Sequence, residues 1–172
     1  RMFASSGAGT STHLAGEMLA DRIGIQLEHV PYKGTPPALT DVASGVVPFM
    51  FDQITAAMPL VQSGKLKLLA VTTADRIALA PELPTMQEAG VDNFEMSSWQ
   101  AVYAPKGTPP EIIQRLNQEI TKALQEQDVK DKLSGQLAME IVASTPEELA
   151  AHMAKEIPRW ADLVEKSGAK AN

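Results

Sequence analysis

The chain has 172 residues, a formal net charge of −6, 44% hydrophobic residues and 21% charged residues, which is typical of a globular protein with one ordinary domain or two small lobes. Its 15 Lys and Arg residues are scattered rather than clustered, so the sequence favours neither nucleic acid nor an anionic membrane surface as a partner. The absence of cysteine excludes disulfides and thiolate chemistry, and no apolar run approaches the ~18 residues of a membrane span.

A glycine-rich turn at residues 5–13 joins the apolar stretch 2–4 to an amphipathic run that contains Leu14, Met18, Leu19 and Ile23. A strand-to-helix turn of this kind presents unpaired backbone N–H groups and the positive end of a helix dipole, and Ser and Thr hydroxyls add further donors. These features suit a small anion. The same residue types also make an ordinary helix cap, and the spacing leaves both interpretations open. Because no Gly-Lys-Ser/Thr or G-x-G-x-x-G pattern is present, a carboxylate fits better than a phosphate.

Helix starts are predicted at three threonine-proline pairs, Thr35-Pro36, Thr108-Pro109 and Thr145-Pro146. Each puts a capping hydroxyl before a proline, and the last two are followed by a glutamate that completes a capping box. Apolar residues then recur at helical spacing in two stripes: Ile112, Leu116, Ile120 and Leu124, and Leu149, Met153, Ile157, Trp160 and Val164. Pro158 is expected to kink or split the last helix.

Short apolar runs between these helices predict strands at residues 26–30, 46–51, 66–72, 99–103 and 139–142. Because helix-like segments separate them, the pattern indicates alternating βα units and a largely parallel sheet covered by helices. Pro48 favours an edge or bulged position for its strand. The segment 94–103 is long enough to cross between lobes, so we expect a lobe boundary near Trp99.

Ligands bind at the carboxyl ends of the strands in open α/β sheets, and three segments are expected there: the glycine turn, residues 31–34 and residues 52–53. Tyr32 offers a hydroxyl and a ring face, and Gly34 allows close approach of the backbone. Asp52 offers an acceptor for a ligand ammonium or hydroxyl, or an anchor for the backbone of a neighbouring loop. It fits equally well as an N-cap for the following helix.

Metal binding and catalysis are not favoured by the polar residues. His13 lies one step into the first helix, where it either donates to an anion or serves in capping or packing. His29 and His152 lie far from it without metal-ligand spacing, so no metal site is predicted, and no cofactor is implied. A nucleophile such as Ser6 or Ser11 would need a base and an orienting acid, and there is no nucleophile elbow.

A series of short motifs runs in order through essentially the whole chain: Ser6 to Thr10, His13 to Glu17, His29 to Gly34, Gly64 to Leu66, Leu69 to Thr72, Pro84-Thr85, Glu88 to Gly90, Ser98-Trp99, Ala104 to Pro109, Arg115 to Asn117 and Thr145 to Leu149. Each motif is weak alone. In this order they resemble the Bug receptors, also called the tripartite tricarboxylate transporter substrate-binding proteins or TctC-like receptors.

The resemblance implies a periplasmic Venus-flytrap receptor with two α/β lobes of the type II periplasmic binding protein class and without enzymatic activity. Such a receptor delivers its ligand to the membrane subunits of a transporter. The ligand would be a small carboxylate: a dicarboxylate, a tricarboxylate, an acidic amino acid or an aromatic acid. Carried onto this chain, the family's carboxylate site points to Ser6, Gly7, Gly9, Thr10, Ser11 and His13, with Tyr32, Gly34 and Asp52 as further lining residues.

Family members are much longer than this chain, and their N-terminal half, which includes the signal peptide and an anion loop, has no counterpart here. The chain also starts without an initiator methionine, so we expect a processed chain or a fragment. Residues 1–98 would be the complete second, ligand-binding lobe. Residues 99–172 would be a crossover strand and C-terminal helices of an incomplete first lobe. Because lobe closure supplies much of the binding energy, we expect weak or absent affinity for the ligand.

The apolar stripes of the C-terminal helices have no obvious partner in the sequence. We therefore expect them to pack on each other or on a second copy of the chain, which would make a homodimer.

Two other function classes stay open at this point. An effector-sensing domain of a transcription regulator or signalling system can share the two-lobe architecture, although no DNA-binding helix-turn-helix is seen. A small hydrolase or transferase would use Ser6 and His13, but it lacks an acid partner.

Overall fold

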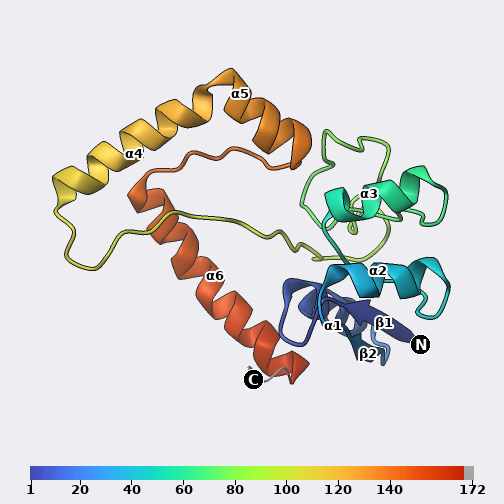
Figure 1. The fold of residues 1–172 in the computed structure, drawn as a ribbon. Helices are drawn as coiled ribbons and strands as arrows, with labels where there is room; N and C mark the ends of the chain where they lie inside the picture. The colour runs from blue at the N-terminus through green and yellow to red at the C-terminus, as the bar shows by residue number, and fades with distance from the viewer. Residues whose placement is uncertain (169–172) are drawn as a thin grey trace. The chain divides into compact units, whose positions relative to one another are not determined.

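The computed structural model describes residues 1–168, which divide into two compact units (Figure 1). Unit 1 comprises residues 1–98 together with the end of the last helix from Ala161, and unit 2 comprises residues 99–160. Each unit is described by itself below.

Unit 1 carries the sheet and three helices, in the order β1 (Met2–Ser5), α1 (Ser11–Ile23), β2 (Glu28–Pro31), α2 (Thr35–Ala43) and α3 (Ile54–Gln62). The strands β1 and β2 pair in parallel, with Phe3 opposite His29. On its other edge β1 forms a parallel bridge from Ala4 to Met50, and the Ala4 N–H donates to the Phe49 carbonyl at 3.0 Å. The first strand therefore lies between two parallel neighbours.

The helix α1 begins and ends where its local sequence dictates. The hydroxyl of its N-cap, Thr10, accepts from the His13 N–H at 3.4 Å. At the other end Gly24 takes a left-handed conformation with φ of 65° and returns its N–H to the Ala20 and Asp21 carbonyls. These two signals fix the length of the helix that follows the glycine turn.

The core of the described chain lies entirely in unit 1, because every buried residue falls between Phe3 and Met96. Phe3 and Phe94 are fully buried. A line of aromatic contacts connects this core, from Phe3 to Phe49, on to Phe51 and then to Phe94, with ring centroids 5.7 to 6.3 Å apart. These contacts anchor β1 and the bridged segment next to it, and so fix the base of the loops that follow them.

Unit 2 contains α4 (Pro110–Gln125), α5 (Gln127–Lys130), the π-helical turn η1 (Asp131–Gln136) and the first part of α6 (Pro146–Ser167). None of the described residues 99–160 is buried. Isolated contacts hold this unit, such as the Asn117 side chain donating to the Ser144 carbonyl at 2.9 Å and the Trp99 ring packed edge-on against His152. Burial therefore contributes little to its stability.

The structure corrects several predicted strands. Residues 46–51 and 66–72 form only single parallel bridges, at Met50 and Val71, and residues 99–103 and 139–142 form no strand in the described chain. A strand needs a neighbour to receive its N–H and C=O groups, and these runs find at most one paired residue. The α/β class with parallel pairing is confirmed, but its sheet has two strands, β1 and β2.

Two of the three predicted threonine caps are also wrong. The Thr35 hydroxyl donates to Asp52 instead, and the Thr108 hydroxyl donates to the Pro105 carbonyl, while Gly34 and Pro109 stand at the N-cap positions. The capping box of Thr145 is confirmed, since Thr145 and Glu148 exchange backbone-to-side-chain hydrogen bonds at 2.8 and 3.2 Å.

The predicted split of the last helix is wrong as well, because α6 runs unbroken through Pro158. The proline leaves the Ala154 carbonyl without its helical donor. Both residues are exposed, so water can satisfy that carbonyl. No helix among the described residues is long and apolar enough to cross a membrane.

The close contact between α1 and β1 yields a stability prediction. A Cβ added at Gly16 would lie 2.0 Å from Cε2 of the buried Phe3 ring. We expect Gly16→Ala to lower the free energy of unfolding by about 1–3 kcal/mol through overpacking, although helix propensity alone favours Ala by about 1 kcal/mol. Urea unfolding followed by circular dichroism measures the change.

The double variant Phe3→Leu/Gly16→Ala serves as the control, since a smaller side chain at Phe3 makes room for the added methyl. We expect it to lose less stability than the sum of the single variants. A Gly16→Ala chain as stable as the original would contradict the packing of α1 on Phe3.

Candidate functional site

Three loops meet at the carboxyl edge of the parallel pairing, and hydrogen bonds tie them together. The Tyr32 N–H donates to the Ser5 carbonyl at 3.0 Å, and the Gly34 N–H donates to the Ser6 carbonyl at 3.1 Å. The Thr35 hydroxyl donates to Asp52 Oδ1 at 3.2 Å. The structure therefore brings together the glycine turn, the loop after β2 and the loop after Met50.

The glycine turn depends on backbone conformations that only glycine adopts without strain. Gly7 has φ of 143° and Gly9 has φ of 75°. The Thr10 hydroxyl donates to the Gly7 carbonyl at 2.7 Å and closes the turn onto the start of α1. The turn is therefore a fixed structure built by its own residues.

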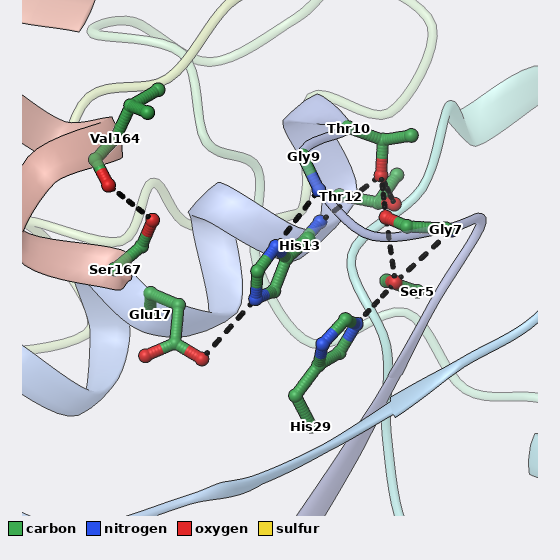
Figure 2. Close-up of polar contacts among 10 residues, drawn as sticks. All are labelled: Ser5, Gly7, Gly9, Thr10, Thr12, His13, Glu17, His29, Val164 and Ser167. Carbon is green, nitrogen blue, oxygen red and sulfur yellow. Dashed lines mark hydrogen bonds and ion pairs between the residues drawn. The ribbon is translucent and has the colours of Figure 1, made fainter. Parts of the chain in front are cut away.

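Thr12 is the centre of the hydroxyl network in this turn, and Figure 2 shows it beside Thr10. Its Oγ1 accepts from the Ser6 N–H at 2.9 Å and lies 2.9 Å from both Ser6 Oγ and Thr10 Oγ1. Sequence reasoning does not select Thr12. The signal available is its position in the first turn of the helix, where a threonine can reach back to the preceding loop.

Free donors remain on the backbone of the turn. Among the hydrogen bonds of residues 1–168, no acceptor faces the N–H groups of Ala8, Ser11 and Thr12. Ala8 and Ser11 are exposed, and Ser11 and Thr12 open the helix α1. Unpaired N–H groups at the positive end of a helix dipole are suited to a carboxylate oxygen.

A pair of stacked histidines, which sequence reasoning misses, lies behind the turn, as Figure 2 shows. The rings of His13 and His29 lie 3.7 Å apart between centroids, and the Phe3 ring stacks on His29 at 5.1 Å. His13 is buried; its Nδ1 accepts from the Gly9 N–H at 3.1 Å, and its Nε2 faces the Glu17 carboxylate at 3.4 Å. His13 thus packs within the turn, which is one of the roles left open by the sequence.

His29 supports the other end of the turn. Its Nε2 is hydrogen-bonded to the hydroxyl of the buried Ser5, which in turn accepts from the Gly7 N–H at 3.1 Å. Burial, with the neighbouring imidazole of His13 as a second cause, lowers the pKa of His29 to about 4. His29 is therefore neutral around pH 7.

The candidate lining residues outside the turn have partners of their own. The Tyr32 hydroxyl donates to the Asp41 carboxylate on α2 at 2.7 Å, and this hydrogen bond raises the pKa of Tyr32. Oδ2 of Asp52 is buried without a hydrogen-bond partner in the described chain, and burial raises the pKa of this carboxyl group. The helix that follows Asp52 begins at Ile54, with Gln53 at its N-cap and no side-chain capping bond.

The described residues hold no group of three or more His, Cys, Asp or Glu side chains placed to bind a metal ion. The arrangement expected of a nucleophile is also missing there. Ser6 Oγ is bonded to Thr12, whereas His13 is directed at Gly9 and Glu17. Ser6 and His13 therefore form no Ser–His pair of the kind that a hydrolase uses.

Comparison with known proteins identifies the family. Residues 2–169 match the tripartite tricarboxylate transporter family receptor, TctC. The chain belongs to this family. The TctC receptors are periplasmic solute-binding proteins rather than enzymes, so the predicted family and the predicted class of protein are confirmed.

Among curated relatives, the chain is 42% identical over 99% of its length to the "UPF0065 protein in tcbD-tcbE intergenic region" of Pseudomonas sp. strain P51. It is 40% identical over 98% of its length to "Protein BugT" of Bordetella pertussis. Each match covers 51% of the relative, so the chain spans about half the length of these proteins.

Solved structures agree with this assignment. The structure described as "R. palustris Rpa4515 with adipate" is 36% identical with a TM-score of 0.82, covering 98% of this chain and 56% of that one. MatC from Rhodopseudomonas palustris, solved with bound malate, is 32% identical with a TM-score of 0.73, covering 95% and 56%. The periplasmic binding protein BugD is 36% identical with a TM-score of 0.78, covering 99% and 57%.

The low pKa of His29 predicts how stability depends on pH in this TctC-family chain. The unfolded chain takes up the proton near the ordinary value of 6.5 and the folded chain only near 4, so the unfolded state binds more protons between these values. The free energy of unfolding should therefore fall as the pH drops from about 6.5 to about 4. Urea unfolding across that range measures the slope.

His29→Gln separates this contribution from that of the acidic residues, because its amide reaches the position of Nε2 and does not titrate. We expect a shallower slope in the variant. Identical slopes in the two proteins would show that His29 is not protonated differently in the folded and unfolded chains.

Proposed function

We propose that this chain is the ligand-binding part of an extracytoplasmic solute receptor that binds a small carboxylate and delivers it to the membrane subunits of a tripartite tricarboxylate-type transporter in the periplasm. The observation that carries the proposal is the set of unpaired N–H groups of Ala8, Ser11 and Thr12 at the rim of the glycine turn. Relatives solved with adipate and malate favour a dicarboxylate as the ligand class.

The proposed site consists of Ser6, Gly7, Gly9, Thr10, Ser11 and His13, lined further by Tyr32, Gly34 and Asp52. These residues have two different roles. The exposed amide of Ser11 is placed to donate to a carboxylate oxygen. The hydroxyls of Ser6 and Thr10 have partners inside the turn, so they hold its shape. Asp52 holds the loop after β2 through Thr35.

The proposed boundary between the two lobes follows from where the buried core and the candidate site lie. Residues 1–98 form the second lobe, which has its own core and carries the site. Residues 99–172 are assigned in this proposal to the first lobe; of these, 169–172 lie outside the described residues, and the helix end from Ala161 groups with unit 1. The lack of buried residues among 99–160 supports this assignment, because an incomplete lobe has nothing to bury its apolar faces against.

Ser11→Pro tests the backbone donor directly. Proline is favoured at the first position of a helix, where it removes only an N–H without a helical partner, and Thr10 already has the extended conformation that precedes proline, with φ of −77° and ψ of 162°. We expect roughly a tenfold to hundredfold loss of affinity for adipate or malate, the value of a hydrogen bond to a charged group, with little change in thermal stability. NMR titration of the amide signals measures weak binding as well as strong binding.

Ser11→Ala is the matched control, since it removes the hydroxyl and keeps the N–H. We expect it to bind nearly as tightly as the original chain, and so roughly tenfold to hundredfold more tightly than Ser11→Pro. The uncharged diamide of adipic acid should leave the amide signals of Ala8, Ser11 and Thr12 unmoved. If adipate or malate binds and shifts other amide signals but leaves these three unmoved, the carboxylate site is not at this turn.

We further infer that the apolar stripe of α4 packs on a second copy of the chain, because Ile112 and Leu116 are each 48% exposed. Ile112→Glu/Leu116→Glu should then convert a dimer into a monomer in light scattering. Val46→Glu, at a residue that is 60% exposed in unit 1, is the control and should leave the dimer intact. A monomeric original chain would contradict the inference.

A further inference from the structure

We propose that His13 is a positioning residue that holds the glycine turn in its binding conformation by accepting a hydrogen bond from the Gly9 amide at Nδ1, so that loss of this acceptor releases the turn. The effect on ligand affinity rests on the proposed function. The effect on the turn itself does not depend on it.

The hydrogen bond from Gly9 fixes the tautomer of His13. A backbone N–H can only donate, so the Nδ1 that lies 3.1 Å from it must be the unprotonated nitrogen of the ring. The ring proton is then on Nε2, which faces Glu17 Oε1 at 3.4 Å. Both nitrogens of this buried ring are therefore committed, one to the turn and one to the helix.

Protonation at Nδ1 would put two donors against each other. The Gly9 N–H would lose its acceptor and face a second N–H, and the turn would have to move at Gly9. Gly9 is exposed and has nothing within 4 Å of its Cβ direction, so the backbone has room to move there. The displacement would reach the neighbouring donors, because Thr10 and Ser11 follow directly.

At the other end of the turn, the hydrogen bond between Ser5 and His29 can persist whether or not His29 Nε2 carries a proton. The hydrogen bond from Gly9 to His13 cannot persist if Nδ1 carries one. The Ser5 hydroxyl can donate to His29 Nε2, or accept from it and donate to the Gly7 carbonyl at 3.1 Å. A hydroxyl adapts to both states of the imidazole, whereas the Gly9 amide does not. Of the two histidines, His13 is therefore the one whose acceptor nitrogen the turn depends on.

The groups around His13 determine what its charge would do. Glu17 on α1 and His29 on β2 face the ring, while β1 contributes the uncharged Phe3. From the end of α6, Lys166 interacts with Asp162 and with the charges on the last turn of α1. Glu17 lies on the Nε2 side of the ring, so its carboxylate would offset much of a positive charge added to His13. Such a charge would attract an anionic ligand only weakly, and the displacement of the turn at Gly9 would have the larger effect on binding.

Nitrogen-15 NMR of the imidazoles tests the proposal on the original chain without any ligand. At about pH 8 we expect His13 to carry its proton on Nε2, because its Nδ1 accepts from the Gly9 amide. A proton on Nδ1 at this pH would overturn the proposal.

Two variants distinguish positioning from packing. Asparagine places its amide oxygen near the position of Nδ1, so His13→Asn keeps the acceptor for Gly9 without titrating; His13→Gln places its amide near Nε2 and loses that acceptor. For malate, we expect His13→Gln to bind about tenfold more weakly than the original chain, because the Gly9 amide has lost its acceptor. His13→Asn should bind nearly as tightly as the original chain. His13→Gln should also show a shifted Gly9 amide signal, which His13→Asn should not.

The outcomes separate this inference from the proposed function. Equal affinity for malate in the original chain and in His13→Gln would overturn the role of His13. Malate and adipate that bind without shifting the amide signals of the turn would instead overturn the carboxylate site, and the imidazole spectrum would still decide whether His13 holds the turn.

Discussion

The position of β1 between two parallel neighbours is the constraint on which the site depends. Phe3, Ala4 and Ser5 are fully buried, with β2 on one edge of the strand and the Met50 segment on the other. Because all three segments run in the same direction, their carboxyl ends meet at one edge. Backbone hydrogen bonds join the first two loops there, and the side-chain hydrogen bond from Thr35 to Asp52 joins the third. A shift of one residue in this register would move Phe3 out of the core, and the turn would lose its base.

A consequence is that most polar side chains of the turn support its structure. The Thr10 hydroxyl donates to the Gly7 carbonyl, and the Thr12 hydroxyl accepts from the Ser6 N–H. The stacked histidines are hydrogen-bonded to the two ends of the turn, His29 to Ser5 and His13 to Gly9. Groups that are already hydrogen-bonded inside the protein are costly to redirect to a ligand. What the turn can offer without such a cost is its backbone N–H groups, which is why we assign recognition of an anion to main-chain donors in a turn so rich in hydroxyls.

The sequence predicts well those features that depend on nearby residues. The helix after the glycine turn, the capping box of Thr145 and the helix α6 that it starts follow from spacings within a few residues. The apolar stripe of α6 is expected to pack, but none of its residues is buried. The strands expected at 99–103 and 139–142 rest on apolar runs alone, and they fail because β structure needs a second chain segment to pair with. The stack of His13 on His29 depends on the register of Phe3 with His29, which no local pattern in either segment specifies.

The candidate site illustrates the same limit. Gly7, Gly9 and Thr10 are correctly predicted to form one turn, since glycines and a capping hydroxyl between a strand and a helix are typical of a tight turn that starts a helix. The partners of Tyr32 and Asp52 could not be predicted, because Asp41 and Thr35 compete for these side chains only once α2 is folded against β2. The choice between ligand contact and structural support is therefore made by tertiary packing.

Recognition at this turn relies on geometry more than on net charge. The chain carries a formal charge of −6, and in residues 1–168 no Lys or Arg side chain hydrogen-bonds to the turn. The attraction for a carboxylate then comes from oriented N–H groups and the helix dipole, which act only over the first turn of the helix. Such donors bind a carboxylate only while their directions are fixed. The imidazole and hydroxyl contacts behind the turn are therefore as much a part of the proposed binding site as the amides that would touch the ligand.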